Sequence, residues 1–227
     1  MGIDCTLISD LHGHYPKDLP GGDLLIVAGD VTNNDHEAPF AVWIEEQPYE
    51  KIVWIAGNHD NIWYKSWLEH GEKRRPRMKE GKWKGPERNE KIEYLCDNGT
   101  IFKDLRIWGS PWSKTFSGMN PHCKAFTVDT EEELAEKWAL IPDDVDILVT
   151  HSPPASRMLD ITITRDRVGS LSLYEKTSNS PRNLQLHVFG HVHESYGEKY
   201  CKPTRYVNAS HVNERYEPVN NPVRIIL

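Results

Sequence analysis

The chain has 227 residues, of which 38% are hydrophobic and 27% are charged, which is usual for a globular protein with one large core. Its formal net charge of −7 at pH 7 argues against a general affinity for the nucleic acid backbone, which favours basic surfaces. The four cysteines form no CxxC pair, and no apolar run approaches transmembrane length. We therefore expect a cytoplasmic protein without a leader or a membrane segment.

Predicted strands and helices alternate through the first part of the chain. Apolar runs over residues 3–9, 24–28 and 51–56 predict strands. Residues 35–47 predict a helix with Asp35 as a possible N-cap, and residues 61–69 predict a second helix. This alternation is typical of an α/β fold.

Residues 72–91 differ in composition from the rest of the chain. They hold nine Lys or Arg, four Glu, two Pro and two Gly. A solvated loop is the favoured interpretation. The alternative is a basic flap that helps to hold an anionic substrate.

The pattern changes after residue 91. Short runs at 91–96, 100–103 and 105–108, with turn residues between them, predict an antiparallel meander. Residues 130–140 predict a helix with an acidic start, and residues 146–150 and 184–189 predict two more strands. Residues 206–209 and 223–227 can complete the sheets. We therefore expect a single α/β domain over residues 1–227, with mixed sheets and a basic loop at 72–91.

Five predicted strands end on residues that commonly bind metal ions. In chain order these are Asp10-x-His12, Gly29-Asp30, Gly57-Asn58-His59-Asp60, His151 and Gly190-His191-Val192-His193. Ligands of open α/β sheets bind at the carboxyl ends of the strands. One such motif occurs easily by chance, but five in a row after five apolar runs are hard to explain by coincidence.

The residue types at these strand ends indicate a dinuclear site. Carboxylate, imidazole and amide ligands suit ions such as Mn, Fe and Zn, and the motifs offer more ligands than one ion needs. Side chains at i and i+2 of an extended chain point to one side, so each of the DxH and HxH pairs can reach one point. Two ions that share a carboxylate are typical of sites that displace groups at phosphorus. His14 and His211 lie near these motifs and are further candidates.

The series DxH…GD…GNHD…H…GHxH resembles the calcineurin-like metallophosphoesterase superfamily, in the same order from residue 10 to residue 193. The stretches "IVWIAGNHD", "RIWGSPWS", "DILVTHSPP" and "LHVFGHVHESYG" are similar to the metallophosphoesterase-domain-containing phosphodiesterases of animals and their microbial relatives. The resemblance implies a four-layer sandwich, in which two mixed β-sheets pack face to face with helices outside.

The resemblance also implies a role for each motif residue. One ion is expected on Asp10, His12 and His193, and the other on Asn58, His151 and His191, with Asp30 bridging the two. His59 is expected near the leaving-group oxygen, as an acid or a charge stabiliser, and Asp60 is expected to accept a hydrogen bond from its ring. The expected cofactors are two divalent ions, Mn²⁺ first, with Fe, Zn, Ni or Co as alternatives.

The expected activity is hydrolysis of small phosphodiesters, including cyclic nucleotides, by a hydroxide that bridges the two ions. A nuclease, a phosphomonoesterase and a diphosphate-cleaving nucleotide hydrolase of the same superfamily stay open, so nucleic acid is a possible but disfavoured partner. A non-catalytic scaffold is remote, because every motif residue is present. A dimer is possible. Trp112, Trp63 and Tyr64 could stack on a substrate ring or pack in the core.

Overall fold

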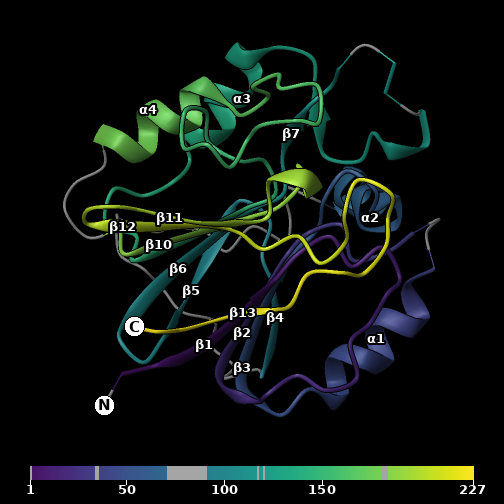
Figure 1. Cartoon of the computed structure of the whole chain (residues 1–227), viewed down its shortest axis with the longest axis vertical. Coiled ribbons are helices and arrows are strands. Elements are labelled where there is room, and N and C mark those ends of the chain that lie inside the picture. Colours follow the sequence, from purple (N-terminus) through teal and green to yellow (C-terminus); the bar gives the residue numbers. More distant parts are fainter. Residues whose placement is uncertain (1, 34–35, 71–90, 117, 120, 180–183) are drawn as a thin grey trace.

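The computed structural model describes residues 2–33, 36–70, 91–116, 118–119, 121–179 and 184–227. Asp35, the possible N-cap, lies outside these residues. The basic loop at 72–91 also lies outside them, except for Lys91. Two β-sheets lie face to face in the middle of the molecule, with α3 (Glu131–Trp138) and α4 (Leu171–Asn179) on one side and α1 (Glu37–Glu46) on the other (Figure 1). The expected four-layer α/β sandwich is confirmed.

Within the described residues, the first sheet holds five strands in the order β13-β1-β2-β3-β4. Their bounds are β1 Asp4–Ile8, β2 Gly22–Ala28, β3 Tyr49–Ile55, β4 Ile92–Tyr94 and β13 Val223–Ile226. Strands β1 to β4 run parallel, and β13 pairs antiparallel with β1. The two ends of the chain therefore lie side by side (Figure 1).

The second sheet has the order β11-β12-β10-β9-β6-β5 among the strands that the structure describes. Their bounds are β5 Asn98–Phe102, β6 Leu105–Ser110, β9 Ile147–Thr150, β10 Leu186–Phe189, β11 Gly197–Cys201 and β12 Thr204–Asn208. The four central strands are parallel, and each edge strand is antiparallel to its neighbour. A short parallel pair, β7 (Ser113–Lys114) with β8 (Thr127–Val128), lies beside it.

The alternation along β2 shows how the layers pack. Leu24, Ile26 and Ala28 point into the core between the sheets, whereas Leu25 and Val27 pack under α1. All five side chains are fully buried, because both faces of this strand are covered. Successive side chains of a strand point to opposite faces, so an unbroken apolar run suits a strand between two layers.

Helix α3 begins at a capping box. The Thr130 side chain accepts a hydrogen bond from the backbone N–H of Glu133, and the Glu133 side chain accepts one from the backbone N–H of Thr130. The helix buries Leu134 and Trp138 against the second sheet. The helix predicted at 130–140 is thus present as Glu131–Trp138. Helix α1 instead has His36 at its N-cap, with no side-chain capping bond.

The predicted antiparallel meander is correct only in part. Strands β5 and β6 form an antiparallel pair, but β4 runs parallel to β3 at the edge of the first sheet. The turn after β4 carries the chain across to the second sheet, because the Asp97 carboxylate accepts hydrogen bonds from Ser110 Oγ and Trp112 Nε1 there. The turn residues that follow β4 therefore mark a change of sheet, and not a hairpin.

Helix α4 and the strands β7, β8 and β11 were not predicted. Helix α4 carries a start signal, because Ser170 Oγ accepts a hydrogen bond from the backbone N–H of Leu173, three residues on. The second helix of the chain, α2, spans Asn61–His70 as expected. In the described part of the chain, no helix is both long and apolar enough to cross a bilayer.

Candidate metal centre

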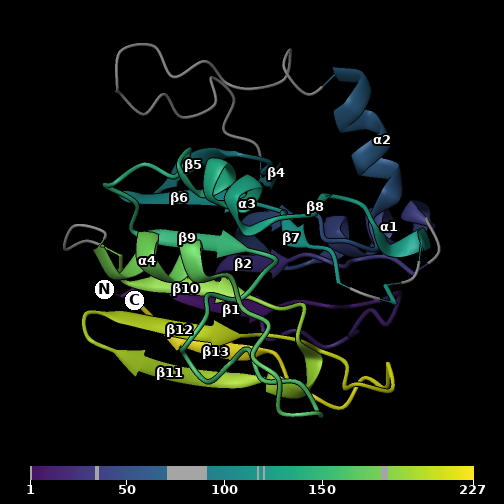
Figure 2. The ribbon, with the colours of Figure 1, turned by 90° about the horizontal axis from the view of Figure 1, so that it is seen from above.

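The predicted ligands meet at one edge of the sandwich. Asp10 and His12 follow β1, Asp30 follows β2 and Asn58 follows β3, all in the first sheet. The second sheet contributes His151 after β9, and His191 and His193 after β10. Strands β9 and β10 run parallel toward the same edge (Figure 2). The 3₁₀ turn η2 (His193–Ser195) begins at the last of these residues. The site is therefore built from both sheets.

The first group of ligands surrounds one point. Suitable atoms of Asp10, His12, Asp30 and His193 all lie within 4.8 Å of one another. His193 Nε2 is 3.3 Å from Asp10 Oδ1, and His12 Nε2 is 3.2 Å from His193 Nε2 and 3.7 Å from Asp30 Oδ2. Ligand atoms around an ion at about 2.1 Å are separated by roughly 3–4 Å, so this group has the size of a metal site.

The second group shares Asp30 with the first. His151 Nε2 is 3.3 Å from Asp30 Oδ2 and 3.0 Å from Asn58 Oδ1. The ring of His191 lies 5.0 Å from the ring of His151, measured between centroids. Asp30 therefore stands between two groups of ligands, in the position expected of a bridging carboxylate.

The backbone at the site is strained in a consistent way. Asp10, His12, Asp30 and His191 have φ values of 52°, 43°, 51° and 69°, in the left-handed region. Each such residue costs on the order of 1 kcal/mol, and such residues cluster at functional sites. The DxH and HxH pairs are thus not extended, and His191 and His193 serve different groups, although the i, i+2 argument placed them at one point.

Two glycines allow the carboxylates to approach the backbone. A Cβ atom at Gly57 would collide with Asp30 Oδ1, and one at Gly190 would collide with Asp10 Oδ2. Because the glycines carry no side chain, the carboxylates can reach the backbone. The backbone N–H of His59 donates to Asp30 Oδ1 at 2.8 Å, and that of His191 donates to the Asp10 carboxylate at 3.1 Å. The glycines of the GNH and GHxH motifs are required by this packing.

Backbone carbonyls orient two of the imidazoles. His151 Nδ1 lies 3.0 Å from the carbonyl oxygen of Ala28, and His193 Nδ1 lies 3.2 Å from that of Asn213. A carbonyl accepts only from an N–H, so each ring carries a proton on Nδ1 and turns Nε2 toward the site. Nε2 is therefore the ring nitrogen that is left to hold an ion.

Burial and the two carboxylates set the charges of the site. Burial lowers the pKa of His12 and that of His191 to about 3, so both rings are neutral. Burial also lowers the pKa of His151, but the Asp30 carboxylate outweighs it and raises this pKa to about 9. Neighbouring imidazoles hold the pKa of Asp30 well below its usual range, in spite of its burial. The site thus combines ionised carboxylates with imidazoles, a donor set that fits divalent ions such as Mn²⁺ or Zn²⁺.

His59 lies at the edge of both groups. Its Nε2 is 4.0 Å from Asp30 Oδ2, and its side chain is 14% exposed. Its ring packs edge-on against the ring of His12 at 4.5 Å. This position suits a residue that faces the reacting group without holding the ion.

Asp60 is not arranged as expected. Among the described residues, its carboxylate accepts hydrogen bonds from the backbone N–H groups of Gly57, Val31 and Thr32 and from the Thr32 hydroxyl, not from the His59 ring. Asp60 thus ties the loop after β2 to the loop after β3. Burial, with the nearby Asp30 carboxylate, raises the pKa of Asp60 to about 7.

Sequence reasoning missed four residues that support the site. Ser210 Oγ donates to Asp10 Oδ2 at 2.7 Å, and Asn208 Oδ1 lies 2.7 Å from the same hydroxyl. The Tyr216 ring, 42% exposed, lies 4.7 Å from the His12 ring and 5.2 Å from the His193 ring. Cys123 Sγ lies 3.5 Å from His59 Nδ1. None of the predicted ligand motifs contains them, because loops elsewhere in the chain bring them to the site.

The other candidates lie elsewhere. His211 Nδ1 lies 2.8 Å from the carbonyl oxygen of Asn220, and neither His211 nor His14 belongs to the ligand group. Trp112 is 3% exposed, and its Nε1 donates to Asp97, so this residue packs in the core. Trp63 and Tyr64 are partly buried and pack against the same hydrophobic layers.

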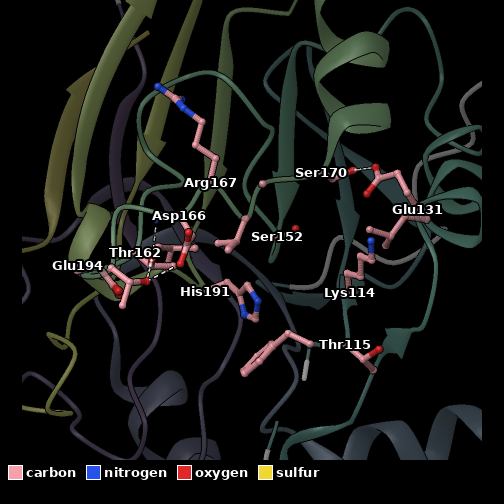
Figure 3. Close-up of a pocket in the computed structure, with 16 residues that line it drawn as sticks. Lys114, Thr115, Glu131, Ser152, Thr162, Asp166, Arg167, Ser170, His191 and Glu194 are labelled. Atoms are coloured by element: carbon pink, nitrogen blue, oxygen red, sulfur yellow. Dashed lines mark hydrogen bonds between the residues drawn. The ribbon is translucent and has the colours of Figure 1, made fainter. Parts of the chain in front are cut away.

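A cavity of about 700 Å³ opens beside the second ligand group. His191 lines it, between Thr162, Asp166 and Glu194 on one side and Lys114 and Thr115 on the other (Figure 3). The charged residues of its lining are three acidic and two basic side chains, which are Glu131, Asp166, Glu194, Lys114 and Arg167.

Comparisons with known proteins agree with this geometry. The sequence profile described as calcineurin-like phosphoesterase matches residues 5–195. The chain is 36% identical to the human and to the mouse Metallophosphoesterase domain-containing protein 1, over 97% of this chain and 69% of each relative. The crystal structure of phosphopantetheinyl hydrolase (PptH) from Mycobacterium tuberculosis shares the fold, with a TM-score of 0.59 at 16% identity over 95% of this chain and 92% of that one. By its sequence profile and its relatives, the chain belongs to the calcineurin-like metallophosphoesterase superfamily of hydrolases.

Proposed function

We propose that this chain is a phosphodiesterase that hydrolyses cyclic nucleotides or other small phosphodiesters with two divalent ions, Mn²⁺ first among them. The observation that carries the proposal is the position of Asp30, whose Oδ2 atom lies 3.7 Å from His12 Nε2 and 3.3 Å from His151 Nε2, in two different ligand groups. One carboxylate between two sets of imidazoles is the arrangement that a pair of ions needs.

The residues would divide the work as follows. Asp10, His12 and His193 would hold one ion, Asn58, His151 and His191 would hold the other, and Asp30 would touch both. Bound there, the ions would supply an activated water and neutralise charge that develops on the phosphoryl oxygens.

His59 would assist the leaving group. As a hydroxide oxygen bonds to phosphorus, the bond between phosphorus and the departing oxygen breaks, and that oxygen gains negative charge. His59 Nε2 lies 4.0 Å from Asp30 Oδ2, at the edge of both ligand groups, and from there it would donate a proton or a hydrogen bond to that oxygen.

The cavity beside His191 favours a diester over a monoester. Its three carboxylates outnumber its two cations, and Arg167 turns away from His191 and lies 3.6 Å from the fully buried Asp160 (Figure 3). The phosphoryl group would lie on the two ions, so the lining meets the rest of the substrate, and its excess of carboxylates disfavours further phosphate groups there. A diester carries a single charge and needs room for a second substituent, which about 700 Å³ supplies.

Two exposed aromatic side chains could receive a ring of the substrate. Tyr216 covers His12 and His193, and Phe116, 61% exposed, lines the cavity with His191. Aromatic rings of this kind stack on a base or an aryl group. They replace Trp112 as the candidates for substrate stacking.

Hydrolysis of bis-p-nitrophenyl phosphate and of p-nitrophenyl phosphate, compared with added Mn²⁺ and after chelation, tests the proposal. We expect Mn-dependent cleavage with a higher kcat/KM for the diester. Asp30→Asn is the control, because loss of the shared ligand should abolish the metal-dependent rate while the chain stays folded. A preference for the monoester would indicate a phosphatase, and no turnover with any metal would indicate a scaffold.

A further inference from the structure

The segment that contains η1 (Pro121–Cys123) lies against the loop that carries Asn58 and His59. Asn58 Nδ2 donates to the carbonyl oxygen of Cys123 at 3.1 Å, and the backbone N–H of Ala125 donates to the carbonyl oxygen of Asn58 at 3.1 Å. Asn61 Nδ2 adds a third bond, to the carbonyl oxygen of His122 at 2.6 Å. Three hydrogen bonds therefore fix Cys123 relative to the reacting end of the site.

The Cys123 side chain makes a specific contact from this fixed position. Its Sγ lies 3.5 Å from Nδ1 of His59, within the range of a hydrogen bond that involves sulfur, and the residue is half-buried. The His59 backbone is held on the other side, because its N–H donates to Asp30 Oδ1. The Cys123 thiol therefore contacts Nδ1 of the His59 ring, whereas Nε2 faces the ligand groups.

The direction of this hydrogen bond follows from what the other ring nitrogen faces. His59 Nε2 faces the ligand groups, 4.0 Å from Asp30 Oδ2, and a ring that donates from there to a departing oxygen carries its proton on Nε2. In a neutral imidazole only one nitrogen carries the proton, so Nδ1 is then an acceptor. A thiol carries a proton at neutral pH and can donate it to such an acceptor.

We propose that Cys123 is a positioning residue, whose thiol donates to His59 Nδ1 and keeps the ring proton on Nε2, directed at the leaving group. The inference rests on the proposed role of His59 in phosphodiester hydrolysis. It adds a residue that no motif of the sequence marks, about sixty positions further along the chain.

A consequence distinguishes this role from simple packing. A hydrogen bond to the departing oxygen matters most when that oxygen is strongly basic, as in a phenoxide, and less when it is weakly basic, as in p-nitrophenoxide. If Cys123 acts through His59, loss of its thiol should depend on the leaving group in the same way as loss of His59 itself.

The test compares methyl phenyl phosphate with methyl p-nitrophenyl phosphate in four variants: Cys123→Ala, Cys123→Ser, His59→Ala and the double variant Cys123→Ala/His59→Ala. For Cys123→Ala we expect about a tenfold lower kcat on the phenyl ester, a smaller loss on the p-nitrophenyl ester and an unchanged KM. Cys123→Ser should recover kcat to within about threefold, because a hydroxyl also donates. In the His59→Ala background, Cys123→Ala should have no further effect.

Cys201→Ala is the matched control, because Cys201 is also a half-buried free cysteine but lies on the edge strand β11. Metal content measured on every variant separates lost positioning from lost ions. An unaffected Cys123→Ala beside an impaired His59→Ala would contradict this inference alone. Full activity of His59→Ala would contradict the proposed role of His59 itself, on which this inference rests. If Cys123→Ala lowers kcat equally on both esters, and does so in the His59→Ala background too, the role of Cys123 is packing alone.

Discussion

At the scale of single residues, Asp10 shows how hydrogen bonds orient a candidate ligand. Its carboxylate accepts hydrogen bonds from the Ser210 hydroxyl and from the backbone N–H of His191. The serine lies 200 positions further along the chain, in a short loop after β12. Such outer contacts hold a ligand in the orientation that a metal requires.

We expect Ser210→Ala to weaken metal binding about 10- to 100-fold, because Asp10 would lose the contact that orients Oδ2. Competition with a fluorescent chelator measures the Kd. Ser178→Ala is the control, since Ser178 is an exposed serine on α4 that contacts Arg157. Equal metal affinity in the wild type and in Ser210→Ala would show that Asp10 needs no support from this hydroxyl.

The candidate ligands could be named from the sequence, but their hydrogen-bond partners could not. Asp10, Asp30 and Asn58 follow apolar runs in recognisable short motifs, so local sequence is enough to find them. Asp60 stands in such a motif too, yet its carboxylate serves the backbone of another loop, and motif position alone did not reveal this. Whether a polar residue touches the substrate or holds a loop depends on which donors the fold brings near it.

At the scale of elements, α3 connects the stability of a helix to the wall of the cavity. Its capping box at Thr130 and Glu133 fixes the first turn, where Glu131 Oε1 accepts hydrogen bonds from Ser170 and Ser172 at the start of α4. The helix start therefore also supports the loop that lines the cavity.

Thr130→Ala should lower the free energy of unfolding by about 1 kcal/mol, because the N–H of Glu133 loses its capping acceptor. Denaturant unfolding measures the change through its midpoint at an unchanged slope. Glu136→Ala, at an exposed position of the same helix, should leave the stability within about 0.5 kcal/mol of the wild type. A Thr130→Ala midpoint equal to that of the control would show that packing alone defines this helix end.

Local patterns predicted the long elements and failed where strands change partners. Residues 91–108 have strand-like runs and turn residues, which also suit a hairpin, so their division between two sheets was invisible. This division depends on Leu95, which packs in the core between the sheets, and on the hydrogen bonds that Asp97 accepts from the second sheet. These are long-range contacts.

At the scale of the whole molecule, the candidate metal centre lies where the two sheets meet. Asp10, His12, Asp30 and Asn58 belong to the first sheet, and His151, His191 and His193 belong to the second. An ion bound to both groups would link the sheets at their open edge, so binding and folding should be coupled.

Removal of metal should therefore lower Tm. Free metal at 100 times Kd stabilises the folded state by about 2.7 kcal/mol for one site, which corresponds to about 5–10 °C for a chain of this size. Thermal unfolding before and after chelation, and again after Mn²⁺ is restored, measures the shift. The Tm of Asp30→Asn should respond much less. A Tm that is the same with and without metal would contradict a site shared by both sheets.

The sequence by itself determined the α/β class, the superfamily and the seven candidate ligands, because these depend on apolar runs and on short motifs at strand ends. Only the tertiary structure decided that β4 belongs to the first sheet, that Trp112 is in the core and that Ser210, Tyr216 and Cys123 surround the centre. Those features depend on contacts between segments far apart in the chain, and no local pattern of hydrophobicity or charge records such contacts.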